Sequence, residues 1–165
     1  MISIWLCPDN DDELYIQNII NDLSDIHNCA RFYPHCTLLS GVKENNNDLE
    51  NIIDKSIKNI GPIMVKSKRI SFTDIFWKTV FIELIVANDL LSLQQNILKQ
   101  VKSDIKYKFD PHISLIYNKM PKESKKKIIN SLKIKSSFMM NKIVAVKTGQ
   151  NISNWKKIVE RKLYA

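Results

Sequence analysis

The sequence predicts an α/β protein with two pseudo-symmetric lobes, each an antiparallel sheet with flanking helices, around a central cleft. Short apolar runs bounded by Pro, Gly or Asn alternate with segments whose apolar residues recur at helical spacing. A His-x-Ser/Thr-Leu motif occurs at His35 and again at His112, 77 residues later. No linker or low-complexity stretch divides the chain, so we expect one bilobal domain over residues 1–165, with halves near 1–70 and 78–165.

The first half is expected to contain three strands and two helices. Asp9 to Asp12 are residues that favour a helix start, and Gly61-Pro62 ends the second helix. The predicted strands are Ile2–Cys7, Arg31–Gly41 and Ile63–Phe72, and the predicted helices include Leu14–Leu23 and Asp48–Asn59.

The second half is expected to follow the same plan and to add a closing strand. Its first strand forms a hairpin-like pair with the last strand of the first half, with the turn near Asp74 to Trp77. The predicted strands are Thr79–Ala87, Lys108–Tyr117, Phe138–Lys147 and Trp155–Leu163, and the predicted helices are Asp89–Asp104 and Lys122–Leu132.

The repeat extends beyond the motifs. The same spacing of 77 places the strand around Ile4 over the strand around Phe81, and Asp12 over Asp89 at each helix start. Two units that are each too small to fold alone are expected to pack about a pseudo-twofold axis. That symmetry brings the two motif strands side by side and turns their histidines into one cleft.

Composition narrows the class of protein. The apolar fraction is 44%, no apolar run is long enough to span a membrane, and the N-terminus lacks the pattern of a secretory signal. The three cysteines lack C-x-x-C spacing, so we expect reduced thiols in a cytoplasmic protein rather than disulfides or a zinc knuckle. The net charge of +8 favours anionic partners such as nucleotides or RNA ends. Lysines between Lys122 and Lys135 also fit a merely solvated helix face.

Strand geometry gives each motif a polar and an apolar face. Side chains two residues apart point to the same face of a strand. His35 therefore shares a face with Thr37, and His112 shares one with Ser114. The residues between them and the leucines that follow point into a core. Each copy is thus expected to present one imidazole and one small hydroxyl to the cleft.

This quartet suits the hydrolysis of a phosphodiester. One imidazole can take a proton from water while the other gives a proton to the leaving oxygen, and histidine titrates near neutral pH. The hydroxyls of Thr37 and Ser114 can donate to the phosphate oxygens where charge builds up. Two histidines without nearby carboxylates make a poor metal site, so we expect neither metal nor cofactor.

A structural role is the ordinary explanation for a single histidine in a strand. Here two of the three histidines in the chain occupy equivalent repeat positions, and each follows a proline and precedes a hydroxyl by two residues. Coincidence explains this poorly, so we interpret His35 and His112 as functional. His27 has no such neighbours and is expected to be structural.

The motifs Pro34-His35-Cys36-Thr37-Leu38 and Pro111-His112-Ile113-Ser114-Leu115 resemble the paired signatures of the two-histidine phosphoesterase superfamily. Among its members, the chain is most similar to the cyclic phosphodiesterases of plants and yeast. The similarity includes Ser3–Asp9, Phe76–Phe81, His112–Tyr117 and Ile143–Thr148 and so covers nearly the whole chain.

The resemblance implies hydrolysis of nucleoside 2′,3′-cyclic phosphates or ADP-ribose 1″,2″-cyclic phosphate. It implies that His35 and His112 are the acid–base pair and that Thr37 and Ser114 bind phosphate. We favour His112 as the base and His35 as the acid, with the reverse assignment left open. The substrate is expected to be a small nucleotide or an RNA end, and the protein a monomer.

Four further residues are candidate substrate contacts. Tyr117 lies off the His112 face by strand alternation, although the family has a tyrosine near the cleft there. Phe76 and Trp77 can stack on a base or simply pack. Lys78 can meet phosphate or be solvated.

Two alternatives stay open at this point. The first is a sister activity of the same fold on 2′,5′-oligoadenylate, cyclic oligonucleotides or RNA ends. The second is a non-catalytic nucleotide- or RNA-binding module that uses the quartet only to recognise phosphate.

Overall fold

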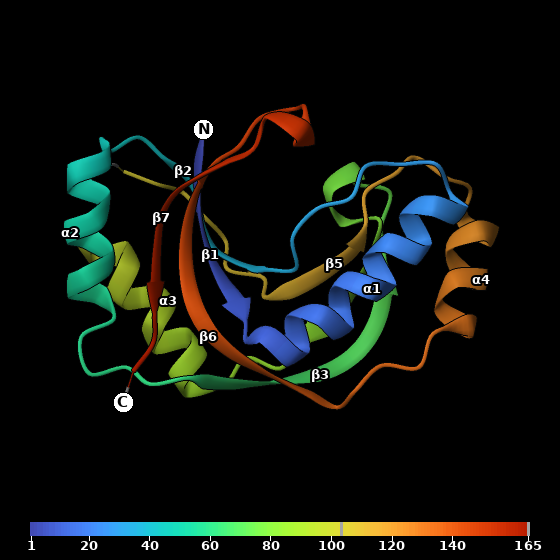
Figure 1. The fold of residues 1–165 in the computed structure, drawn as a ribbon, viewed down its shortest axis with the longest axis horizontal. Helices are drawn as coiled ribbons and strands as arrows, with labels where there is room; N and C mark the ends of the chain where they lie inside the picture. Colours follow the sequence, from blue (N-terminus) through green and yellow to red (C-terminus); the bar gives the residue numbers. More distant parts are fainter. Residues whose placement is uncertain (103, 165) are drawn as a thin grey trace.

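The computed structural model describes residues 1–102 and 104–164. Each half has the order strand, helix, strand, helix, strand (Figure 1). The first half consists of β1 (Ile2–Pro8), α1 (Asn10–Ile26), β2 (Cys36–Val42), α2 (Asn46–Ser56) and β3 (Ile63–Phe72). The second half consists of β4 (Val80–Leu84), α3 (Asn88–Gln100), β5 (His112–Ile116), α4 (Lys122–Ser131) and β6 (Ser137–Lys147). A last strand, β7 (Lys156–Lys162), follows, and the short 3₁₀ helices η1 (Phe76–Lys78) and η2 (Ile152–Asn154) come after β3 and β6.

The expected elements are present with shifted ends. Strands β2 and β5 begin at Cys36 and His112, later than predicted. Strand β5 starts directly after Pro111 and β2 starts two residues after Pro34, and a proline cannot donate a ladder hydrogen bond. Helix α1 starts as expected, with the Asp9 side chain accepting from the backbone N–H of Asp12 at 2.9 Å. Helix α3 ends at Gln100 rather than Asp104. Position 103 of that predicted helix and position 165 of the predicted second half lie outside the described residues.

The seven strands form one antiparallel sheet in the order β1-β2-β5-β4-β3-β6-β7. Strand β1 also pairs with β6, so six strands close into a ring and β7 lies outside it on β6. The long, curved strands β3 and β6 make one side of this ring (Figure 1).

The expectation of a separate sheet in each lobe is wrong. Four pairings join the halves: β1 with β6, β3 with β4, β3 with β6, and β2 with β5. The pairing of β2 with β5, which we call the seam, consists of the single pair Cys36↔Ile113. Two separate sheets do not form because, within the ring, β3 and β6 each pair only with strands of the other half.

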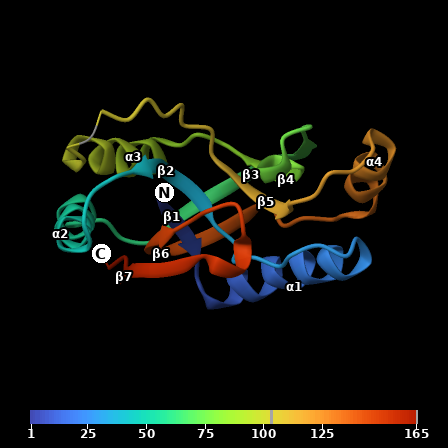
Figure 2. The same ribbon diagram turned by 90° about the horizontal axis from the view of Figure 1, so that it is seen from above.

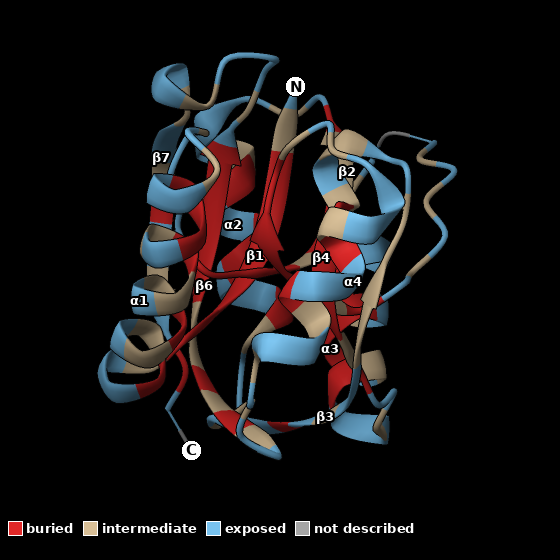
Figure 3. Ribbon diagram, turned by 90° about the vertical axis from the view of Figure 1, so that its right-hand side faces the viewer, coloured by how far each residue is buried: buried red, intermediate tan, exposed pale blue. Residues whose placement is uncertain are grey.

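The helices lie outside the ring (Figure 2). Helix α1 packs on β1 and β5, α3 on β2 and β3, and α4 on β3 and β4. Buried residues gather on the strands and on the helix faces turned toward them, while the outer helix faces are exposed (Figure 3). The strand faces turned away from the helices are therefore free to line a cavity. None of the helices in the described part of the chain is long and apolar enough to cross a membrane.

Lys125 departs from the solvated lysine face expected for α4. It is only 3% exposed, and its ammonium donates to the carbonyl of Thr73 at 2.8 Å and to the Asp74 carboxylate at 2.6 Å. Helix α4 packs on β3 and β4, which puts this side chain under their connection. Lys125 thus holds the segment that leads into η1.

Candidate active site

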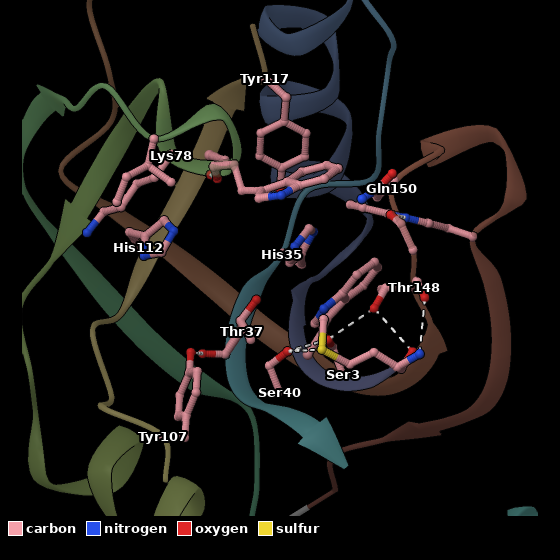
Figure 4. Close-up of a pocket in the computed structure, with 17 residues that line it drawn as sticks. Ser3, His35, Thr37, Ser40, Lys78, Tyr107, His112, Tyr117, Thr148 and Gln150 are labelled. Carbon is pink, nitrogen blue, oxygen red and sulfur yellow. Dashed lines mark hydrogen bonds between the residues drawn. The ribbon is translucent and has the colours of Figure 1, made fainter. Parts of the chain in front are cut away.

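The structure places His35, Thr37, His112 and Ser114 around one cavity of ≈ 440 Å³ (Figure 4). The pair Cys36↔Ile113 lies between the two motifs, and both of its side chains are fully buried in the core. Because neighbouring strand residues point to opposite faces, the adjacent histidines turn toward the cavity. The quartet therefore lies at the seam between β2 of the first half and β5 of the second half.

Tyr117 reaches the same cavity although simple alternation puts it on the other face. A register shift in the β4–β5 pairing allows Leu115 and Ile116 to be buried in succession, which returns Tyr117 to the cavity side. The β1–β2 pairing has the same irregularity, so Ser40 also faces the cavity. Two consecutive apolar residues after each hydroxyl are the sequence signal for these bulges.

Both imidazoles are held in the same way. His35 Nδ1 lies 2.7 Å from the carbonyl oxygen of Tyr33, and His112 Nδ1 lies 2.7 Å from that of Asp110. A carbonyl oxygen only accepts, so each Nδ1 carries the hydrogen and donates it. In the neutral ring the Nε2 lone pair is then available to a ligand. The carbonyl two residues earlier fixes the tautomer in both motifs.

Burial keeps both histidines in the neutral form. His35 stacks on Trp5 with ring centroids 3.7 Å apart, and burial lowers its pKa to about 4, with the charge of His112 adding to the effect. Burial also lowers the pKa of His112, assisted by Lys78. Each hydrogen bond to a backbone carbonyl opposes the shift. At pH 7 the free cavity therefore holds two neutral imidazoles.

The free energy of unfolding should therefore fall with acid. Between pH 6.5 and about 4 the unfolded chain binds a proton at His35 that the folded protein does not. At about 1.4 kcal/mol per pH unit, this site costs about 2 kcal/mol by pH 5. Urea unfolding at pH 7 and pH 5 should show a larger loss for wild type than for His35→Gln. Equal losses in the two proteins would contradict the lowered pKa.

The two hydroxyls of the quartet differ in their contacts. Ser114 Oγ donates to the Trp77 carbonyl at 3.2 Å. Thr37 lines the cavity, and its carbonyl accepts from the Tyr107 hydroxyl at 3.3 Å. To donate to a bound phosphate, the Ser114 hydroxyl must rotate away from Trp77.

All three tryptophans of the chain line the cavity. Trp77 was predicted, whereas Trp5 and Trp155 were missed. Phe76 was also predicted as a contact but does not line the cavity; it packs edge-on against Trp77, with ring centroids 4.7 Å apart. Phe76 therefore packs against Trp77, which forms an aromatic wall of the cavity together with Tyr117 and Trp155.

The first strand of each half departs from the spacing of 77. Trp5 pairs with Thr37, and Phe81 pairs with Ser114. The ring centroids of Phe81 and His112 are 5.3 Å apart, so Phe81 contacts His112 as Trp5 contacts His35. The structural equivalent of Phe81 is therefore Trp5 and not Ile4. The two strands are offset by 76 residues, one fewer than the 77 that separate the motifs.

Lys78 lines the cavity as predicted, but it has partners already. Its ammonium forms an ion pair with the Asp110 carboxylate and lies 4.3 Å from the centroid of the Phe81 ring. Asp110 also holds His112 through its carbonyl. Lys78 therefore braces the second motif in the free protein.

The sequence missed much of the rest of the lining. The additional residues are Met1, Ser3, Ser40, Ile75, Tyr107, Thr148, Gly149 and Gln150. Ser40 had a signal, since it lies five residues after His35 as Tyr117 lies five after His112. The others come from strand and loop positions without a motif.

Comparison with known proteins gives the same fold and a family. The Cyclic phosphodiesterase-like protein family model matches residues 1–163. A cyclic phosphodiesterase of Arabidopsis thaliana is 20% identical over 152 residues, covering 88% of this chain and 84% of the relative.

Solved structures share this fold over nearly the whole chain. Escherichia coli LigT complexed with 3′-AMP superposes with a TM-score of 0.64 at 9% identity, covering 99% of this chain and 98% of that one. TT0787 of Thermus thermophilus also gives 0.64, at 11% identity, covering 98% and 97%. Identities this low show only a shared fold. With the family match over almost the full length, the chain belongs to the cyclic phosphodiesterase-like family of enzymes, within the two-histidine phosphoesterase superfamily.

Proposed function

We propose that the protein hydrolyses ribose cyclic phosphodiesters to phosphomonoesters by His/His acid–base catalysis that needs no metal. The substrates proposed are nucleoside 2′,3′-cyclic phosphates, ADP-ribose 1″,2″-cyclic phosphate, or both. One observation carries the proposal: His35 and His112 have identical Nδ1 hydrogen bonds and line one cavity, each two residues from a hydroxyl that lines it too.

In the proposed reaction, water attacks phosphorus while one imidazole Nε2 removes its proton. Thr37 and Ser114 donate to the non-bridging oxygens as their charge grows. The P–O bond to one ribose oxygen breaks, and that oxygen takes a proton from the other imidazole, which is charged. The products are a free ribose hydroxyl and a phosphomonoester.

The neutral state of the free site has a consequence for this mechanism. A general acid must carry a proton, yet the pKa of His35 is about 4 before substrate binds. The negative phosphate of the substrate favours the charged imidazole and so raises this pKa. Both rings have the same Nδ1 hydrogen bond, so these contacts do not distinguish the base from the acid. The assignment of His112 as the base and His35 as the acid therefore stays the prediction made from the sequence.

The aromatic wall fits a nucleotide base. The ring centroids of Trp77 and Tyr117 are 5.3 Å apart, and those of Trp77 and Trp155 are 5.8 Å apart. These rings give an apolar surface beside the quartet on which a base can stack. Structures of LigT have been solved with 3′-AMP, ATP and NADP⁺, which supports a nucleotide as the ligand of this fold.

Phosphorus NMR of the purified protein tests the proposal. We expect each active cyclic phosphate to be converted to a monoester signal at an unchanged rate in EDTA. The panel should contain the nucleoside 2′,3′-cyclic phosphates and ADP-ribose 1″,2″-cyclic phosphate. If a folded sample turns over none of them, the proposal fails. If EDTA abolishes turnover, the metal-free mechanism fails.

A further inference from the structure

The segment that carries Trp77 to the cavity lies largely at the surface. It joins β3 to β4, comprises residues 73–79 and contains η1; we call it the β3–β4 connection. Trp77 is 38% exposed and Ile75 is 60% exposed. A tryptophan in a core is held by the side chains packed around it, but solvent replaces part of that packing here. The position of the Trp77 ring therefore depends on what holds its backbone.

Hydrogen bonds close the connection into a loop. The N–H of Thr73 donates to the carbonyl of Thr79 at 3.1 Å. The Thr73 hydroxyl donates to the Lys78 carbonyl and accepts from the N–H of Ile75 at 3.1 Å. Thr79 Oγ1 accepts from the N–H of Asn118 at 3.0 Å. The end of the loop at Thr79 is thus fixed to the segment that follows β5.

Lys125 of α4 holds the other end of the loop. Its ammonium donates to the Thr73 carbonyl at 2.8 Å and to the Asp74 carboxylate at 2.6 Å. Hydrogen bonding to Lys125 lowers the pKa of the Asp74 carboxyl, so this partner is charged at neutral pH. Lys125 is buried and neither residue lines the cavity. The loop is therefore anchored from outside the site.

Stability alone does not explain a buried lysine here. Taking an ammonium out of water costs about as much as its partners return, and an apolar side chain of similar volume often serves equally well. An apolar side chain cannot, however, make a directed bond to the connection. The bonds of Lys125 to Thr73 and Asp74 fix where the loop begins, three to four residues before Trp77.

The loop is also bonded to the site, through a contact that catalysis must break. Ser114 Oγ donates to the Trp77 carbonyl at 3.2 Å in the free protein. In the proposed reaction this hydrogen turns to the phosphate, so the bond is lost when the substrate binds. The bonds of Lys125 lie outside the cavity and are kept.

We propose that Lys125 is a positioning residue for base recognition: through Thr73 and Asp74 it keeps Trp77 in place while Ser114 binds the phosphate. This rests on the proposed function in placing the phosphate at the quartet and the base on Trp77. Lys125 itself touches no part of the substrate.

The indole N–H signals of the three tryptophans report this position by NMR without any ligand. In Lys125→Met, which keeps most of the side chain and removes the ammonium, the Trp77 signal should shift or broaden. The signal of the buried Trp5 should stay. Lys126→Met is the matched control, because Lys126 is exposed on the same helix and pairs with Glu123 at 3.2 Å. It should leave all three signals unchanged.

Calorimetric titration with two ligands separates the base from the phosphate. One is adenosine 3′-monophosphate, and the other is methyl riboside 3′-phosphate, in which a methoxy group replaces the base. In wild type the base should improve the Kd by about 5- to 150-fold, the usual contribution of stacking. Lys125→Met should lose most of that gain and leave the Kd of the riboside unchanged. Lys126→Met should change neither Kd.

Asp74→Ala serves as the second variant if Lys125→Met does not fold, since the Asp74 side chain is 97% exposed. It removes one of the two bonds that Lys125 makes to the loop. The Kd of adenosine 3′-monophosphate should rise about 2- to 5-fold, as expected for an exposed ion pair. The Kd of the riboside should again stay the same.

An unchanged Trp77 signal in Lys125→Met, or in Asp74→Ala where that variant replaces it, would overturn the positioning role. A loss of affinity that affects both ligands alike would do so too, as would equal Kd values for the two ligands in wild type. Neither measurement needs turnover, so the phosphorus NMR assay decides the proposed function separately. A loss confined to the adenine ligand in a protein without hydrolysis keeps the positioning role and rejects the reaction. Hydrolysis with an unmoved Trp77 signal does the opposite.

Discussion

Replacing His112 by alanine should lower kcat/KM for the active cyclic phosphate by about 10²- to 10⁴-fold, the usual contribution of one general acid or base. His35→Ala should cost as much, because hydrolysis needs both proton transfers. The thermal melt of His112→Ala should stay close to that of wild type, since its ring is only partly buried. His35→Gln, which keeps most of the volume next to Trp5, serves as the second variant at the buried position.

The chain offers its own control in His27, which lies just past α1 and outside the cavity. His27→Ala should retain full activity. If His35→Ala or His112→Ala does so as well, the acid–base pair is wrong. A nucleotide p-nitrophenyl ester, whose leaving group departs without a proton, then separates the roles. We expect it to rescue His35→Ala and not His112→Ala; rescue of the other variant would exchange the two roles, and rescue of both would reject the division.

Trp5→Ala should lower the free energy of unfolding by about 3–5 kcal/mol, as expected for removing a buried tryptophan. Trp5 is 3% exposed and packs with Cys7, Val144 and Val146 in addition to His35. The same change opens one face of the His35 ring to water. The pKa of His35 should then rise from about 4 toward 6.5, because burial is the main cause of the shift.

Urea unfolding measures the first effect and an NMR titration of the imidazole Hε1 signals measures the second. Trp5→Phe keeps an aromatic ring over His35 and should restore most of the lowered pKa. If the pKa stays near 4 in Trp5→Ala, stacking on Trp5 does not shield His35.

Spacing and alternation predicted the central part of the site. The 77-residue repeat paired His35 with His112, and strand alternation added Thr37 and Ser114 on the same face. These features are local, or repeat at a fixed distance, so the sequence carries them directly.

Features that depend on how strands meet were harder to predict. Tyr117 needed a bulge, although the adjacent buried Leu115 and Ile116 indicate one. Trp5 was missed because the repeat loses one residue in its first strand. The joined sheet depends on pairing between β1 and β6, which are distant in sequence and have no motif in common.

The seam between β2 and β5 is also the junction of the ring with the fewest residue pairs. Five of the six junctions in the ring are held by ladders of several residue pairs, whereas this one has the single pair Cys36↔Ile113. The least work is needed to part the strands where the ladder is shortest, and that place lies between the two histidines. Parting β2 from β5 at this junction would change the distance between His35 and His112 while the longer ladders of the ring stay paired.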